Sequence, residues 1–422
     1  MEEVNSGSIY GNILKEHEYK KLLFSNLINR FGDSVESIAF VWIVYQITHS
    51  AAWSAIIFAL NMLPNVIVQP FAGVIVEKLN KKHVVIATHF LRALVIIFFV
   101  ILFRLHMVNP LVLSIFTLLI TTAESFNMPA GNAFVAQVLK KEDINSGLSL
   151  ITVFNSVASL VGSGSGGFII AKLGVGAAML TDVATFIIAA ILIALIKDGC
   201  ETFNENVGEK ISKDGGFIKM LKEGMRYVFM TPEVRNFCVI CVVLNCLIVP
   251  ITALQAPIAD KIFGMGSELL SIGGVFASIG GIIGASVLPY LSKKLSPFGI
   301  TMIGIAMLAV GTGSVALGRF VRGNAVLSYA LVSICLFIVM SATSLVGGIL
   351  NIQFMKSVDK DFMARASAVF NSFAIAATPL GSLIVSMLVT RISVSHMLIV
   401  DASLAIGALL VLMILRPSLG RS

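Results

Sequence analysis

The chain has 422 residues, of which 57% are hydrophobic and 13% are charged, and its formal net charge is +7. Soluble domains carry about 25% charged residues, so this composition excludes a large soluble enzyme with a water-covered surface. We expect an integral membrane protein, and because the apolar runs are long and do not alternate, helices rather than a barrel should cross the membrane.

A helix needs about 20 apolar residues to cross the hydrocarbon core, and the sequence divides at charged clusters and at Gly, Pro and Asn turns into twelve such spans. They cover residues 21–48, 52–76, 83–104, 109–137, 144–170, 176–197, 235–256, 268–290, 298–318, 325–353, 364–390 and 395–415. The expected parts are an N-terminal segment 1–20, a six-helix bundle 21–197, a linker 198–234 with an amphipathic helix, a second bundle 235–416 and a tail 417–422.

The distribution of basic residues supports an even number of spans. With both termini in the cytoplasm, 22 of the 30 Lys and Arg residues fall on the cytoplasmic side and six in the outer turns. Cytoplasmic loops carry the excess of Lys and Arg in membrane proteins. We therefore expect the termini, the linker and the tail in the cytoplasm of a cell of bacterial type, with the chain in its inner membrane.

The first span carries three ionisable residues, Arg30, Asp33 and Glu36. Counted from Lys21, the two acids lie about 18 and 22 Å along a helix, which is near the bilayer midplane. Residues three apart are neighbours on a helix surface, so the three should form one polar arc. A charge at this depth costs at least ~2.5 kcal/mol, so we expect it to face a wet cavity and to have a partner.

The expected partners come from three spans: Arg30 within the first helix, Arg92 in the third, and Glu124 in the fourth, acting through Arg92. Two interpretations remain open. In one, the group is a structural salt-bridge network that locks these spans together. In the other, it is a proton or cation site, because a desolvated carboxylate takes up a proton more readily than one in water; Glu36 is then the favoured carrier.

The loop after the second span reads "GVIVEKLNKKH" and contains Gly73, Glu77, Lys78, Lys81 and Lys82. Positive charge alone explains the lysines but neither the glycine nor the acid. This pattern resembles the loop signature of the major facilitator superfamily. The resemblance implies that Gly73 permits a close helix approach, and that Glu77 meets the N-terminus of the eleventh span as a latch of the outward-open state.

Further stretches narrow the resemblance: "LINRFGDSVESIAFVWIVYQITHSA", "FNMPAGNAFVAQVLKKEDINSGLSL", "KEGMRYVFMTPEVRNF" and "VPITALQAPIADKIFG". They are similar to the branch that holds macrolide-efflux proteins and the enterobactin exporter. The resemblance implies an all-α integral membrane fold of twelve helices in two pseudo-symmetric six-helix bundles. Asp33 belongs to the pattern of that branch, which gives it a more structural role than Glu36.

The fifth span contains a glycine-rich run, "VGSGSGGF", with Gly162, Gly166 and Gly167. A phosphate cradle would need a preceding strand and a following Lys-Ser or Lys-Thr pair, and neither is present. The glycines are therefore expected to permit tight helix packing. Antiporters of the family carry a proline in this motif; here it is absent, and the internal repeat places Pro379 of the eleventh span at the equivalent position.

Three pairs of similar short segments, each pair six spans apart, indicate a duplicated six-helix unit. "VFNS" recurs in spans five and eleven, "LNKK" is followed by "LSKK" after spans two and eight, and the segment at Asp182 resembles that at Asp401. Two repeats with a site between them are a transporter architecture. Asp182 and Asp401 are expected near the outer surface, with structural roles.

Polar residues within spans are expected to contribute directional groups to an otherwise apolar substrate cavity. The candidates are Asn61, Gln69, Asn155, Asn245, Gln255 and Asn371. Taken singly, each is better explained as a hydrogen-bonding contact between helices than as a substrate contact. No metal-ligand spacing and no nucleophile–base pair appears, and without a Walker motif the energy source is expected to be a proton gradient, with no cofactor.

The sequence thus predicts a monomeric secondary transporter that exports a lipophilic, drug-like or macrolide-like molecule by proton antiport, with membrane lipids and no nucleic acid as partners. Two alternatives remain. One is a dedicated exporter or flippase for a siderophore or a lysophospholipid. The other is a membrane binding or immunity protein that does not transport its ligand.

Overall fold

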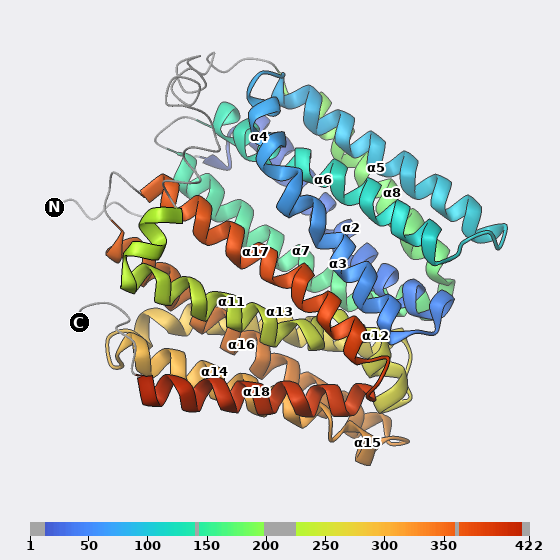
Figure 1. The fold of residues 1–422 in the computed structure, drawn as a ribbon. Helices are drawn as coiled ribbons and strands as arrows, with labels where there is room; N and C mark the ends of the chain where they lie inside the picture. The colour runs from blue at the N-terminus through green and yellow to red at the C-terminus, as the bar shows by residue number, and fades with distance from the viewer. Residues whose placement is uncertain (1–12, 140–142, 198–224, 359–362, 416–422) are drawn as a thin grey trace. The chain divides into compact units, whose positions relative to one another are not determined.

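The computed structural model describes residues 13–139, 143–197, 225–358 and 363–415, and over these ranges it is helical, with no strand (Figure 1). The elements of the first half are α2 (His17–Thr48), α3 (Ala51–Ile67), α4 (Gln69–Glu77), α5 (Lys81–Arg104), α6 (Pro110–Val138), α7 (Ile144–Leu173) and α8 (Val175–Ala194). Those of the second half are α11 (Pro232–Ala253), α12 (Gln255–Pro257), η1 (Ile258–Phe263), α13 (Ser267–Leu291), α14 (Pro297–Val315), α15 (Gly318–Val321), α16 (Ala325–Ser357), α17 (Met363–Leu388) and α18 (Val394–Leu415).

Ten of the described helices are long and apolar enough to cross a membrane, and α3 with α4, bent by 41° at their junction, makes an eleventh if the pair is counted as one span. The bend follows Pro64 by one turn, because a proline inside a helix removes a hydrogen bond and kinks the axis. α2 has 32 residues, enough to cross, but its ionisable residues keep it outside that count. The all-helical membrane fold is confirmed, and the twelfth span stays a prediction.

Several helices begin where the sequence supplies a capping side chain. The side chains of Asn80, Asn109, Ser296 and Asn324 each accept a hydrogen bond from the backbone N–H three residues on, at the starts of α5, α6, α14 and α16. Such caps satisfy backbone donors that the first turn leaves unpaired. Local sequence therefore fixes where these spans start.

The chain divides into two compact units, Met1–Ile43 with Pro64–Gly208, and Val44–Leu63 with Glu209–Ser422. In the first unit α5 packs against α6 and α8; in the second, α14 packs against α16 and α18 in the same relation six spans later. This correspondence supports the internal duplication.

The expected boundaries at 21–197 and 235–416 stay predictions. Segment 1–20 is described only from residue 13 and linker 198–234 only from residue 225, and tail 417–422 lies outside the described residues.

Candidate functional site

The ionisable residues of α2 lie in the first unit, where α2 contacts α8 at a glycine. A Cβ built on Gly32 would collide with the Thr185 side chain and lie 2.5 Å from Oδ1 of Asp182. Glycine therefore lets the α2 backbone reach α8 at this level, as small residues do at helix interfaces within membranes. This contact carries the Asp182 carboxyl to the same depth as the acids of α2.

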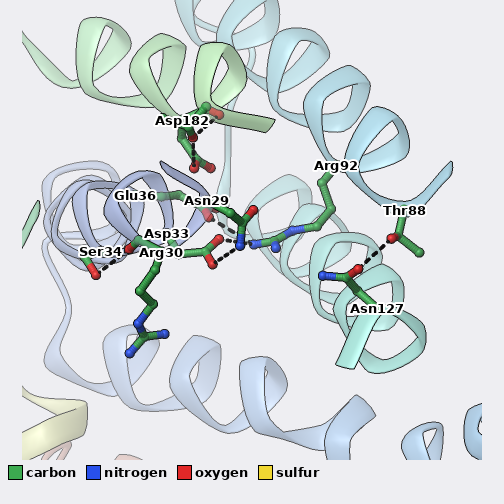
Figure 2. A network of polar contacts seen from close by, with 10 residues as sticks. Asn29, Arg30, Asp33, Ser34, Glu36, Thr88, Arg92, Asn127 and Asp182 are labelled. Carbon is green, nitrogen blue, oxygen red and sulfur yellow. Dashed lines mark hydrogen bonds and ion pairs between the residues drawn. The ribbon is translucent and has the colours of Figure 1, made fainter. Parts of the chain in front are cut away.

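Arg92 of α5 is the centre of the polar network in Figure 2. Its Nη2 lies 3.0 Å from Oδ1 of Asp33 and 3.5 Å from Oε2 of Glu36, and its side chain is only 4% exposed. The Nδ2 of Asn29 donates a second hydrogen bond to Asp33, at 2.9 Å to Oδ2. The predicted ion pair between the first and third spans is thus present, with one guanidinium between two carboxylates.

Asp182 of α8 completes this acidic cluster, which we define as Asp33, Glu36 and Asp182. One carboxylate oxygen from each lies within 4.8 Å of the others, and Asp182 is fully buried. Its Oδ1 accepts a hydrogen bond from Thr185, while Oδ2 has no partner among the described residues. Asp182 therefore lies beside the two acids of α2, a contact that the sequence did not predict, and its expected structural role near the outer surface stays a prediction.

Aromatic and imidazole rings cover the Arg92 side of the site. The guanidinium carbon lies 4.2 Å from the centre of the Phe186 ring, a cation–π contact. The His89 ring lies 5.6 Å from the same ring and is 4% exposed. Nε of Arg92 and Nδ1 of His89 have no hydrogen-bond partner among the described residues, so polar groups remain unsatisfied around the cluster.

The position of Arg30 differs from the expectation. Arg30 is exposed, and its side chain points away from Asp33 and Arg92 in Figure 2. Its long, flexible stem lets the charge leave the polar arc, and its link to the site is an electrostatic attraction to Glu124. Glu124 of α6 also interacts electrostatically with Arg92, as the sequence suggested.

The two acids of α2 face different surroundings. The Asp33 side chain remains 20% exposed, whereas that of Glu36 is 11% exposed and lies against Arg92 and Asp182 inside the first unit. Glu36 was expected to face a water-filled cavity beside Asp33, and that expectation was wrong for Glu36. A proton reaching Glu36 must therefore pass through other groups of the unit.

Two lysines of the loop signature donate hydrogen bonds to backbone carbonyl groups in the described residues. Nζ of Lys81 donates to the Glu77 carbonyl at 2.7 Å, and Nζ of Lys82 donates to the Ile196 carbonyl at 2.7 Å. Glu77 and Lys78 are exposed, and a Cβ on Gly73 would meet nothing within 4 Å. The close approach expected at Gly73 is therefore not present here, and the latch stays a prediction.

The glycine run of α7 packs against α2. A Cβ on Gly162 would lie 2.6 Å from the Phe31 carbonyl oxygen, and one on Gly166 would lie 3.3 Å from the Ile38 Cβ. The structure thus brings these glycines into the tight contact that the sequence predicts; for Gly167 the contact stays a prediction. Pro379 lies inside α17, as its place in the repeat suggested.

The six polar residues proposed for the substrate cavity are spread over both units. Asn245 donates within its own helix to the Cys241 carbonyl, and Gln69 donates to the sulfur of Met128. Oδ1 of Asn155 is buried without a partner in the described part of the chain. No hydrogen bond joins these three residues to Asn61, Gln255 or Asn371 in the described part of the chain, so the cavity stays a prediction. Asp401 is buried in the second unit at 3% exposure, and its expected structural role near the outer surface stays a prediction.

Comparison with known proteins adds family information. The sequence model of the Major Facilitator Superfamily matches residues 22–377. An uncharacterized MFS-type transporter, YkuC of Bacillus subtilis, is 28% identical over 185 residues, 43% of this chain and 42% of its own length. The multidrug efflux pump Tap of Mycolicibacterium fortuitum is 26% identical over 246 residues, 56% of this chain and 58% of its own. The matches thus span about half the length of these curated relatives.

Solved structures share the fold at low sequence identity. The nucleoside transporter NupG superposes with a TM-score of 0.74 at 12% identity, covering 94% of this chain and 98% of its own. A bacterial homolog of the human lysosomal transporter Spinster, in an inward-facing and unoccupied conformation, gives a TM-score of 0.68 at 10% identity, covering 96% and 95%. At such identities the likeness shows the fold alone.

Proposed function

The chain belongs to the major facilitator superfamily and is a multi-pass membrane transporter, not an enzyme; from this premise we propose that it exports amphipathic small molecules in exchange for protons. The acidic cluster around Arg92 carries the proposal. The name of the efflux pump Tap supports a drug-like substrate, and the inner membrane with cytoplasmic termini is the proposed location.

Charge balance is the main support for proton exchange. The cluster and Glu124 together hold four carboxyl groups around one buried guanidinium. Two carboxylates at 4.8 Å repel each other by at least about 3 kcal/mol at an effective dielectric constant near 20. Burial of several uncompensated charges is untenable, so the cluster is neutralised by protons.

Glu36 and Asp182 are the proposed sites of the exchanged proton. One carboxyl oxygen of Glu36 lies within 4.8 Å of one of Asp182, and two acids this close together can share one proton. Release of that proton leaves a net negative charge beside Arg92, which favours a different position of α2 or α8. A cationic or polar group of the substrate can compensate this negative charge. Substrate binding then favours proton release, and the two together drive alternating access.

A bound metal ion is a weaker explanation of the same geometry. Three carboxylates with oxygens within 4.8 Å can hold a cation. However, the Arg92 guanidinium already lies against two of them and would repel a second positive charge. A proton meets no such barrier, because it neutralises a carboxyl group without needing room for a coordination shell.

The salt-bridge interpretation remains the second candidate, because Arg92 joins α2 to α5 at 3.0 Å. A screen of amphipathic compounds in proteoliposomes with an imposed pH gradient separates the two, using the parent, Asp33→Asn and Glu36→Gln. The proposal expects uphill export by the parent, its loss when an ionophore collapses the gradient, and loss of gradient dependence in Glu36→Gln. Equal uphill export by the parent and both variants would refute proton coupling and leave the structural network.

A dedicated exporter would give uphill transport of a single compound class in the same screen. A binding protein would retain ligand in detergent and give no transport under any gradient. Neither alternative has a specific structural observation in its favour, so the screen begins with cationic amphiphiles of different shapes. The number of compound classes that the protein exports in this screen then decides between a multidrug pump and a dedicated exporter.

A further inference from the structure

A small cavity lies inside the first unit, next to the acidic cluster. Its volume is about 50 Å³, which has room for about two or three water molecules. The polar residues that line it are Ser25, Asn26 and Asn29 of α2, His89 of α5 and Asn127 of α6. We call this cavity the polar chamber.

Unsatisfied polar atoms indicate that the chamber is wet. Oδ1 of Asn29 and Nδ1 of His89 are buried and have no partner among the described residues, and His89 is 4% exposed. Leaving such groups unpaired costs about 1–3 kcal/mol each, and buried water is the usual remedy. Oδ1 of Asn127 already accepts from Thr88 at 3.1 Å, which leaves its amide N–H groups for water.

The chamber lies at the end of the unit where α2 begins. Leu22 and Val85, near the starts of α2 and α5, and Phe134 and Ile193, near the ends of α6 and α8, line it and also belong to one buried hydrophobic cluster. That apolar group separates the chamber from the helix ends. Neutral amides in so small a volume suit water and protons and leave no room for a hydrated metal cation.

Asn29 lies between the chamber and the cluster. It lines the chamber, its Oδ1 has no partner among the described residues, and its Nδ2 donates to Oδ2 of Asp33 at 2.9 Å. An amide does not itself relay protons, so a proton from the chamber can reach Asp33 only when the Asn29 side chain turns aside and chamber water takes its place. Each transfer breaks an O–H bond of a protonated water and forms one at a carboxylate oxygen of Asp33.

We propose that water in the polar chamber supplies protons to and accepts them from Asp33, and that Asn29 gates this exchange. The relay rests on the proposed proton coupling, and it names the route by which the buried Glu36 and Asp182 exchange protons with water. The charged and titratable groups around the route are Asp33 and Glu36 of α2, His89 and Arg92 of α5, Glu124 of α6 and Asp182 of α8.

Gly131 provides a way to fill the chamber. It lines the chamber, and a Cβ built on it would meet nothing within 4 Å, so Gly131→Leu is expected to fold. Gly407 of α18 is the matched control: it too is partly buried in a helix, its Cβ would meet nothing within 4 Å, and it lies in the second unit. Asn29→Ala removes the gate and leaves the chamber in place.

The experiment is infrared measurement of hydrogen–deuterium exchange at the buried protonated carboxyl groups of the full-length protein in detergent, with the band assigned by Asp182→Asn and Glu36→Gln. Since leucine cannot replace the hydrogen bonds of displaced water, Gly131→Leu should slow exchange by about tenfold or more. Asn29→Ala should accelerate exchange, and Gly407→Leu should leave it at the parent rate.

The inference is overturned if Gly131→Leu and Gly407→Leu exchange alike, or if Asn29→Ala does not accelerate exchange. Thermal unfolding of each variant, measured alongside, identifies any change that arises from misfolding; Gly131→Ala then serves as the milder filling variant. The exchange measurement needs no substrate. If the variants do not change the exchange rate as expected while the parent still transports under a pH gradient, only the route through the polar chamber is rejected. Failure of transport in the parent rejects the proposed function instead.

Discussion

Replacing Arg92 by methionine removes the one buried cation that contacts the acidic cluster in the described part of the chain, and it keeps a long apolar side chain against Phe186. The guanidinium lies 3.0 Å from Asp33 and 3.5 Å from Glu36. At an effective dielectric constant near 20, each contact corresponds to about 5 kcal/mol of Coulomb energy. Water around the partly exposed Asp33 reduces its share, and breaking a buried pair commonly costs about 3–5 kcal/mol.

We therefore expect Arg92→Met to lose about 3–5 kcal/mol of unfolding free energy in mildly alkaline buffer. The sign of the pH dependence follows from the carboxylates left without a cation. In the folded variant they bind protons more tightly than in the unfolded chain, so acidification restores stability and rising pH removes it. Denaturant unfolding of detergent-solubilised protein at mildly acidic and mildly alkaline pH measures both quantities.

A second substitution provides the control. Arg92→Met/Asp33→Asn removes one of the uncompensated charges and should recover part of the lost stability, which a double-mutant cycle quantifies. The reasoning is refuted if Arg92→Met is as stable as the parent at alkaline pH, or if acidification destabilises it as much as the parent. Either result would mean that Arg92 does not compensate the cluster.

Three further predictions follow from other contacts. Gly32→Ala should lower the thermal stability, because its Cβ collides with Thr185, and Gly32→Ala/Thr185→Ala should recover part of the loss; no recovery would argue against the α2–α8 contact. Tyr45→Phe removes the 2.8 Å hydrogen bond from the Tyr45 hydroxyl to Asp260 and should cost about 1 kcal/mol of unfolding free energy; an unchanged unfolding midpoint would contradict that contact. Hydrogen bonds from the backbone N–H of Lys197 and the side chain of Lys21 lower the pKa of Glu18, so its stabilising effect should be present near neutral pH and vanish as pH falls through that lowered pKa. A stability difference between the parent and Glu18→Gln that persists in acid would contradict this.

Much of the fold could be predicted from the sequence, because each span is a long apolar run with local start signals. The expected span 83–104 corresponds to α5, which covers Lys81–Arg104, and the expected span 144–170 corresponds to α7, which covers Ile144–Leu173. Asn80 and Asn109 mark two helix starts through side-chain caps that the sequence displays directly. Among the described helices, the criterion of length and hydropathy leaves α2 out, because its ionisable residues interrupt the apolar sequence, and counts α3 with α4 only as a bent pair.

The candidate site could be predicted only in part. Asp33, Glu36 and Arg92 were identifiable because ionisable residues within apolar spans need partners. Asp182 was missed, since its contact with Glu36 depends on how α8 packs against α2, which helical periodicity does not reveal. The available signal was Gly32 directly before Asp33, a small residue where two backbones approach closely. Arg30 was misplaced, because residues on one helix face can direct long side chains apart.

The polar chamber could not be predicted from any one segment. Asn29, His89 and Asn127 come from three helices, and each alone is explained as an ordinary polar contact between spans. Only packing shows that they line one cavity of about 50 Å³. Its unsatisfied atoms then distinguish a wet chamber from a packing defect.

Proton release on substrate binding tests the carboxyl cluster most directly. With a substrate identified in the liposome screen, the detergent-solubilised protein is mixed with that compound in weakly buffered solution containing a pH indicator. The account predicts that the parent releases protons in proportion to bound substrate, and that Glu36→Gln/Asp182→Asn binds without releasing them. Proton release by the double variant equal to that of the parent, or binding by the parent with no release, would contradict it.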